Sequence, residues 1–296
     1  MFTRPPLTTR EGVPRFVPDE GYAESFGEQW NRYRRVQLDS ETGKPLSRRR
    51  LFEGTGWPER LDGERVLEVG CGAGRFTEVL LDAGAEVWAV DATSAVDAAH
   101  ANLGDREGLH LAQADLFDLP FAPDAFDRVL CFGVLQHTPD PRRAFLAVCA
   151  HARPGGWVAA DVYRRHPYVD RWSAKTLWRP LTTRLPRGTL RRVVEWYVPR
   201  WLPVDTRLAR VPNAGRFLTA VVPCWNYTGL VDLDRDQLRA WAVLDTFDAL
   251  SPRYDFPQTL EAVHGWVADA GLVDATVTYG GNGIEVRGRR PPAPAS

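Results

Sequence analysis

Short apolar runs alternate with amphipathic stretches between residues 65 and 163, and this alternation constrains the fold more than any other feature of the sequence. The run RVLEVG (65–70) ends in glycine, and the stretch after it places Phe76, Val79 and Leu80 on one helical face. Similar β-type runs occupy residues 85–91, 109–115, 128–133 and 156–163. Strands that alternate with helices predict a doubly wound α/β fold with a parallel sheet.

The alternation of predicted strands and helices stops after Tyr163 and resumes near residue 259. Residues 164–247 are rich in Arg, Pro and Trp, with helical fragments such as TLRRVVEWYV at 189–198. A helix over 259–272 then precedes two strands that Gly-Gly-Asn-Gly joins as a hairpin. We therefore expect an N-terminal segment over 1–60, a core over 61–163 and 248–290, and a helical insertion over 164–247 after the fifth strand.

The composition is that of a water-soluble globular protein, with 44% apolar and 25% charged residues. No apolar run approaches the roughly 20 residues that span a bilayer, and the N-terminus does not look like a secretory signal. The four cysteines form no C-x-x-C pair, so we expect reduced thiols, a cytoplasmic location and no metal site.

The charge is unevenly distributed along the chain. Residues 164–216 contain twelve arginines and one lysine against three acids, a net charge of +10. Since the whole chain carries −1, the rest carries −11. This asymmetry predicts that the basic segment meets anionic partners or covers an acidic core.

A glycine-rich turn follows the first strand of the core. The stretch VLEVGCGAGRF places Gly70, Gly72 and Gly74 there, where glycine allows positive φ and the close approach of a ligand. The spacing is G-x-G-x-G, so the dinucleotide pattern G-x-G-x-x-G fails. Asp91 closes the second strand and could accept both hydroxyls of a ribose, and Asp115 closes the third.

With these motifs the chain resembles the class I S-adenosylmethionine-dependent methyltransferases. The resemblance covers residues 65–163 through VLEVGCGAGRF, VWAVDAT, QADLFDLPF, FDRVLCFGVLQHTPD and RPGGWVAADVY. It implies a Rossmann-like sheet of seven strands whose last strand is antiparallel. It also implies S-adenosylmethionine as cofactor and S-adenosylhomocysteine as product.

The resemblance carries roles over to individual positions. Glu68 would orient the glycine turn, Asp91 would hold the ribose, and Asp115 with the Leu116 amide would hold adenine. The implied cofactor-binding set in the core is Glu68, Gly70, Cys71, Gly72, Gly74, Asp91, Ala92, Asp115, Leu116, Phe132, Gly133 and Gln136.

Tyr22, Phe26 and Trp30 lie four residues apart and would share one face of a helix. In similar proteins an N-terminal helix folds over the cofactor, so we expect Tyr22 and Trp30 to contact it. The alternative is a helix that only packs on the core. The flanks also resemble a bacterial subgroup often found with cell-surface glycan or secondary-metabolite genes.

His137 follows the fourth strand in FGVLQHTPDP, and such strand ends face the ligand crevice of these folds. An imidazole there could take a proton from a methyl acceptor, and Asp161 could orient it. Two other roles stay open for His137: a residue of the acceptor site without base duty, or a packed polar residue. His264 is expected to be packed or solvated.

The resemblance implies that the insertion caps the acceptor site. The expected acceptor-binding residues are Tyr163, Arg164, His166, Trp172 and Tyr254. Arg side chains suit phosphate or carboxylate groups and Trp faces suit sugars or planar rings. We expect methylation of a hydroxyl, or an amine, on an acidic or glycosylated small molecule. Alternatives are an RNA (tRNA) methyltransferase, a non-catalytic cofactor-binding protein, or arginines that only solvate helices.

Overall fold

The computed structural model describes residues 1–18, 21–166, 173–211, 215, 219 and 221–293, except for the side chains of Tyr22 and Glu24. The chain divides into two compact units. The first comprises residues 1–39, 45–164 and 254–296, and the second comprises residues 40–44 and 165–253.

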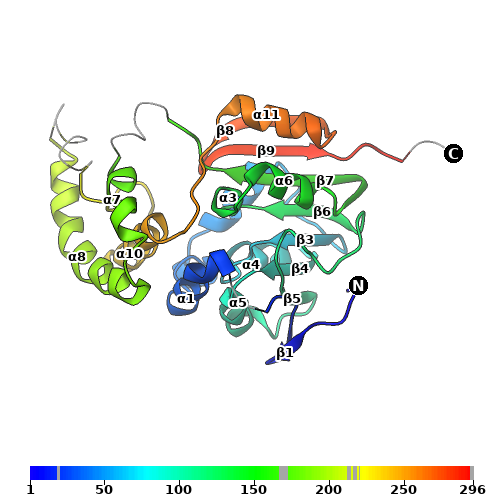
Figure 1. Ribbon diagram of the computed structural model, residues 1–296, viewed down its shortest axis with the longest axis horizontal. Coiled ribbons are helices and arrows are strands. Elements are labelled where there is room, and N and C mark those ends of the chain that lie inside the picture. The colour runs from blue at the N-terminus through cyan, green and yellow to red at the C-terminus, as the bar shows by residue number, and fades with distance from the viewer. Residues whose placement is uncertain (19–20, 167–172, 212–214, 216–218, 220, 294–296) are drawn as a thin grey trace. The chain divides into compact units, whose positions relative to one another are not determined.

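The first unit is built on a nine-stranded sheet in the order β1-β2-β5-β4-β3-β6-β7-β9-β8 (Figure 1). The strands are β1 (Thr8–Arg10), β2 (Val13–Arg15), β3 (Arg65–Val69), β4 (Glu86–Asp91), β5 (Leu109–Gln113), β6 (Phe126–Cys131), β7 (Ala152–Val162), β8 (Val273–Gly280) and β9 (Gly283–Arg289). Strands β5, β4, β3, β6 and β7 run parallel, and β9 is antiparallel to both β7 and β8. The strands predicted from residue 65 onward are all present, and the last one is antiparallel as expected.

The expectation of seven strands was wrong, because β1 and β2 extend the sheet at its β5 edge. These two strands form a hairpin around Glu11 and Gly12, both at positive φ. β2 joins β5 through the pairing of Arg15 with Gln113 and a 2.8 Å bond from the Phe16 amide to the Gln113 carbonyl. Three-residue strands are too short to show an alternating pattern in the sequence.

Helices cover both faces of this sheet, because its central strands are apolar on both sides. The helical segments of the first unit are η1 (Gly21–Ala23), α1 (Glu24–Arg32), α3 (Leu46–Thr55), α4 (Arg75–Asp82), α5 (Ala95–Leu103), η2 (Leu135–His137), α6 (Pro141–Cys149) and α11 (Leu260–Asp269). In β4, Val87 and Ala89 join the core cluster shared with α3, α4 and α5. Trp88 and Val90 join the cluster shared with α6 and α11.

The second unit contains the helices α7 (Ala174–Thr182), α8 (Arg187–Leu208) and α10 (Arg235–Leu250). The short helix α2 (Asp39–Thr42) lies at the boundary, since Asp39 belongs to the first unit. In α10 the N-terminus is fixed by a capping box between Asp234 and Gln237. None of the helices described here is both long enough and apolar enough to span a bilayer.

Phe145 should be the most costly side chain to truncate on α6. It is fully buried, and its ring centroid lies 6.0 Å from that of Trp266 on α11. We expect Phe145→Ala to lower the free energy of unfolding by about 3–5 kcal/mol in urea titrations, because it leaves a cavity. Leu146→Ala, at a half-buried neighbouring position, is the control. Equal losses in the two variants would contradict this account of the core.

Candidate functional site

The carboxyl end of β3 leads directly into the glycine turn. Gly70 has a φ of +80°, and its amide donates to the Val90 carbonyl of the neighbouring β4 at 2.7 Å. A Cβ at Gly70 would lie 2.1 Å from Cγ2 of Val134. The turn therefore tolerates only glycine at this position and runs close against the loop that follows β6.

Asp91 lies at the end of β4 and binds the glycine turn directly. One carboxylate oxygen accepts from the Gly72 amide at 3.0 Å, and the other accepts from the amide and hydroxyl of Thr93 at 2.9 and 2.8 Å. The structure thus brings together the first two sequence-predicted elements of the site. A half-buried carboxylate held this way is oriented for charge-assisted hydrogen bonds to a ligand's hydroxyl groups.

Glu68 is buried beneath the turn, with 2% of its surface exposed. Burial raises the pKa of Glu68 to about 8, although a 2.6 Å hydrogen bond from the Thr77 hydroxyl opposes the shift and the Asp91 charge adds to it. At neutral pH the side chain therefore retains its proton in most molecules. Cys71 on the same turn is also buried, which raises its pKa well above the ordinary thiol value and makes it a poor nucleophile.

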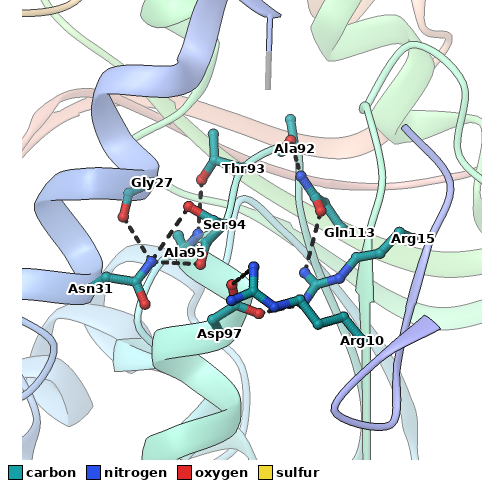
Figure 2. A network of polar contacts seen from close by, with 10 residues as sticks. All are labelled: Arg10, Arg15, Gly27, Asn31, Ala92, Thr93, Ser94, Ala95, Asp97 and Gln113. Atoms are coloured by element: carbon teal, nitrogen blue, oxygen red, sulfur yellow. Dashed lines mark hydrogen bonds and ion pairs between the residues drawn. The ribbon is translucent and has the colours of Figure 1, made fainter. Parts of the chain in front are cut away.

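The third strand contributes Asp115 and Leu116. The Asp115 carboxylate accepts from the Phe117 amide at 2.9 Å, which fixes the turn after β5, and Leu116 is buried. The neighbouring Gln113 side chain donates to the Ala92 carbonyl at 3.0 Å, so the loops after β5 and β4 are tied together (Figure 2).

Helix α1 lies against this edge of the sheet. A Cβ on Gly72 would lie 3.2 Å from the Trp30 indole, and the Phe26 ring centroid lies 5.0 Å from that of His137. The Asn31 amide group donates to the Ser94 carbonyl at 2.7 Å and to the Gly27 carbonyl at 2.9 Å, which joins α1 to the loop after β4 (Figure 2). Asn31 could not be recognised from the sequence, since a polar residue on a helix gives no signal of its partner.

Asp161 is 1% exposed and has three described partners, none of which is His137. Its carboxylate accepts from Arg50 at 2.7 Å, from Asn282 at 3.1 Å and from the Gly133 amide. Arg50 also lies over the rings of Phe76 and Phe132, at 5.3 and 5.8 Å from their centroids. The structure therefore places Asp161 in an ion pair below Phe132 and Gly133, and Arg50 and Asn282 are further polar residues that the sequence did not reveal.

His137 is 6% exposed and is brought together with two of the predicted acceptor residues. Its Nδ1 lies 3.1 Å from the Tyr254 carbonyl, and its ring packs edge-on against Tyr163 at 5.4 Å. A carbonyl oxygen can only accept, so Nδ1 carries the proton and Nε2 of the neutral ring carries the lone pair. Next to it, Gln136 is fully buried, and its side-chain amide has no hydrogen-bond partner among the described residues.

The remaining predicted acceptor residues are more dispersed. The Arg164 guanidinium lies 3.8 Å above the Tyr279 ring centroid on β8. His166 belongs to the second unit, and Trp172 lies outside the described residues, as does the side chain of Tyr22. Arg179, one of the other arginines of the basic stretch, donates to the carbonyls of Ala249 and Pro252 at 3.1 and 2.8 Å, so it holds the end of α10.

Comparison with known proteins identifies the central part of the chain. Residues 67–160 match the methyltransferase domain family. The ubiquinone biosynthesis O-methyltransferase of Bordetella bronchiseptica is 36% identical over 114 residues, which are 36% of this chain and 46% of that protein. Its counterpart in Aromatoleum aromaticum is 36% identical over 117 residues, which are 37% and 50%.

The matched region thus spans about half the length of these curated relatives. Among solved structures, Haemonchus contortus phosphoethanolamine N-methyltransferase 2 in complex with S-adenosyl-L-methionine aligns with a TM-score of 0.48 and 14% identity. That alignment covers 88% of this chain and 44% of the other. Residues 67–160 therefore form a methyltransferase domain, and the strand order and the glycine turn beside Asp91 resemble those of the class I S-adenosylmethionine-dependent methyltransferases.

Proposed function

We propose that this protein transfers a methyl group from S-adenosylmethionine to a hydroxyl oxygen of a small molecule. One observation carries the proposal: the glycine turn, the Asp91 carboxylate and the Trp30 ring meet at one edge of the sheet. When bound, the cofactor supplies a methyl group activated by a sulfonium sulfur. The protein must hold the cofactor, align the acceptor and exclude water.

The residues at this edge fit such a cofactor. Gly70 and Gly72 have positive φ, and a Cβ at these positions would crowd Val134 and Trp30, so the close turn requires glycine. Asp91 would accept from the two ribose hydroxyls, and Asp115 with the buried Leu116 would hold the adenine. Trp30 from α1 would cover the nucleoside. The buried Gln136 amide would bind a polar group of the cofactor, since an unsatisfied buried amide is costly.

His137 would act as the general base. The Tyr254 carbonyl fixes the tautomer in which Nε2 holds the lone pair, which suits proton abstraction from a hydroxyl. Phe26 and Tyr163 pack on the ring and restrict its rotation. The curated relatives are named as O-methyltransferases, which supports an oxygen acceptor over a nitrogen acceptor. Asp161 would act indirectly, by holding the Gly133 amide and Arg50 in place.

For the acceptor we propose an acidic or glycosylated small molecule. The N-terminal part of the second unit falls in a strongly basic stretch of the chain, with a net charge of +10 over residues 164–216. Such a segment suits an anionic acceptor. We place the reaction in the cytoplasm, where the free thiols of Cys71, Cys131, Cys149 and Cys224 stay reduced.

Replacement of Asp91 tests the cofactor site. We expect Asp91→Ala to weaken S-adenosylmethionine binding by about 10–100-fold in titration calorimetry, because charge-assisted hydrogen bonds to the ribose are lost. Asp82→Ala, which removes an exposed acid from the far end of α4, should leave the affinity unchanged. If Asp91→Ala binds as tightly as the wild type while remaining folded, the assigned role is wrong.

Replacement of His137 tests the base. His137→Ala should lower kcat by about 10²–10⁴-fold, with the affinity for S-adenosylmethionine retained. The assay is the release of S-adenosylhomocysteine with a panel of phenolic acids and sugar acids. His264→Ala, at an exposed position on α11, is the matched control. If His137→Ala keeps the full kcat of the wild type, the His137 side chain only packs in the structure and is not a base.

The raised pKa of Glu68 predicts a pH-dependent stability. Between about pH 5 and pH 8 the unfolded chain loses the Glu68 proton and the folded chain keeps it, so the folded state loses stability as the pH rises. Glu68→Gln should therefore raise the Tm of the cofactor-free protein, by an amount that grows across this range. For Glu59→Gln, at an exposed position, the difference in Tm from the wild type should not change with pH. If the difference for Glu68→Gln does not change with pH either, the Glu68 carboxyl titrates normally.

A further inference from the structure

We propose that the outer face of α8 binds the surface of an anionic lipid bilayer. This face, here called the α8 strip, consists of Arg192, Val193, Trp196, Arg200, Val204 and Arg207. At 3.6 residues per turn these positions fall within an arc of about 120°. The proposal concerns the location of the protein and does not depend on methyl transfer.

The opposite face of α8 accounts for the packing of the helix. Leu190, Val194, Val198 and Leu202 are buried and follow one another at four-residue spacing. They form the inner side of a helix that packs with α10. The α8 strip lies on the other side of the helix and is therefore not required for the core of the second unit.

The apolar members of the α8 strip are unusually exposed. Trp196 is 63% exposed, Val193 is 46% exposed and Val204 is 38% exposed. Helix α7 of the same unit also has exposed apolar side chains outside the strip: Leu177, Trp178 and Leu181 are 49%, 41% and 55% exposed. Exposed apolar side chains concentrated on neighbouring turns of one helix mark an interaction surface.

The basic members have no acidic partners in the described part of the chain. The Arg200 guanidinium lies 5.1 Å from the Trp196 ring centroid and donates to the Trp196 carbonyl at 2.6 Å. Arg192 donates to the Gly188 carbonyl at 3.2 Å, one turn earlier on its own helix. All three arginines of the strip are exposed, so their charges are available to anionic groups.

This combination favours a lipid surface over two other partners. The same strip on a second copy would bring arginines against arginines in a symmetric dimer. Single-stranded RNA would use Trp and Arg, but Val193 and Val204 of the strip offer no aromatic face for bases. A bilayer interface accepts all three kinds of side chain, with aliphatic groups inserted, Trp at the headgroup level and Arg on lipid phosphates.

Vesicle sedimentation of the full chain tests the proposal. Phosphatidylcholine vesicles with about 30% phosphatidylglycerol should bind the protein at least tenfold more strongly than pure phosphatidylcholine, and added salt should weaken the binding. Trp196→Ser and Arg200→Glu should each lower the binding about fivefold or more.

Two variants of the same unit are the matched controls. Leu230→Ser removes an apolar side chain that is 77% exposed, and Arg235→Glu reverses an exposed charge at the start of α10, both outside the strip. Controls that bind like the wild type support the proposal, provided that all four variants keep the wild-type Tm.

Several outcomes would overturn the proposal. These are no sedimentation with either vesicle, equal loss in strip and control variants, or binding to phosphatidylcholine alone that equals binding to the anionic mixture. A dimer in light scattering that Trp196→Ser dissociates would assign the strip to a second copy. Bulk tRNA that binds more tightly than the vesicles, and loses this binding in Arg200→Glu, would assign it to RNA.

Discussion

The hydrogen bond from the Gly72 amide to the Asp91 carboxylate organises the carboxyl edge of the sheet. It joins the loops after β3 and β4, whose strands are parallel neighbours. Because Asp91 also fixes Thr93, and Asn31 of α1 reaches the carbonyl of Ser94, the same small loop supports the helix above the site. One carboxylate thus connects the sheet, the turn and the covering helix. The cofactor contacts proposed for Gly72, Asp91 and Trp30 depend on that arrangement.

Much of the first unit could be predicted because its signals are local. The runs 65–70 and 85–91 are rich in apolar residues, and the helix starting at Pro141 has its Asp140 cap one residue earlier. The hairpin β1–β2 escaped prediction, since three residues cannot establish a period. The site was only partly predictable. Gly70, Gly72 and Asp91 can be recognised in the sequence from their residue type and position.

The polar partners of the site residues cannot be recognised in this way. Arg50 and Asn282 reach Asp161 from 111 and 121 residues away in the chain, and Tyr254 meets His137 across 117 residues. Such pairings are set by tertiary packing rather than by local sequence. For the same reason the sequence suggested Asp161 as a partner of His137. In the structure its described hydrogen bonds go to a guanidinium, an amide side chain and a backbone amide instead.

The N-terminal hairpin has a consequence for the solution behaviour of the sheet. An edge strand displays unpaired amide and carbonyl groups that can recruit a strand from another molecule. β2 takes up part of that row on β5, and the buried Arg15 anchors it through Asp97 and Gln113. The edge of the sheet is therefore the three-residue strand β1 instead of β5, and an edge this short offers few unpaired groups for intermolecular β-sheet growth.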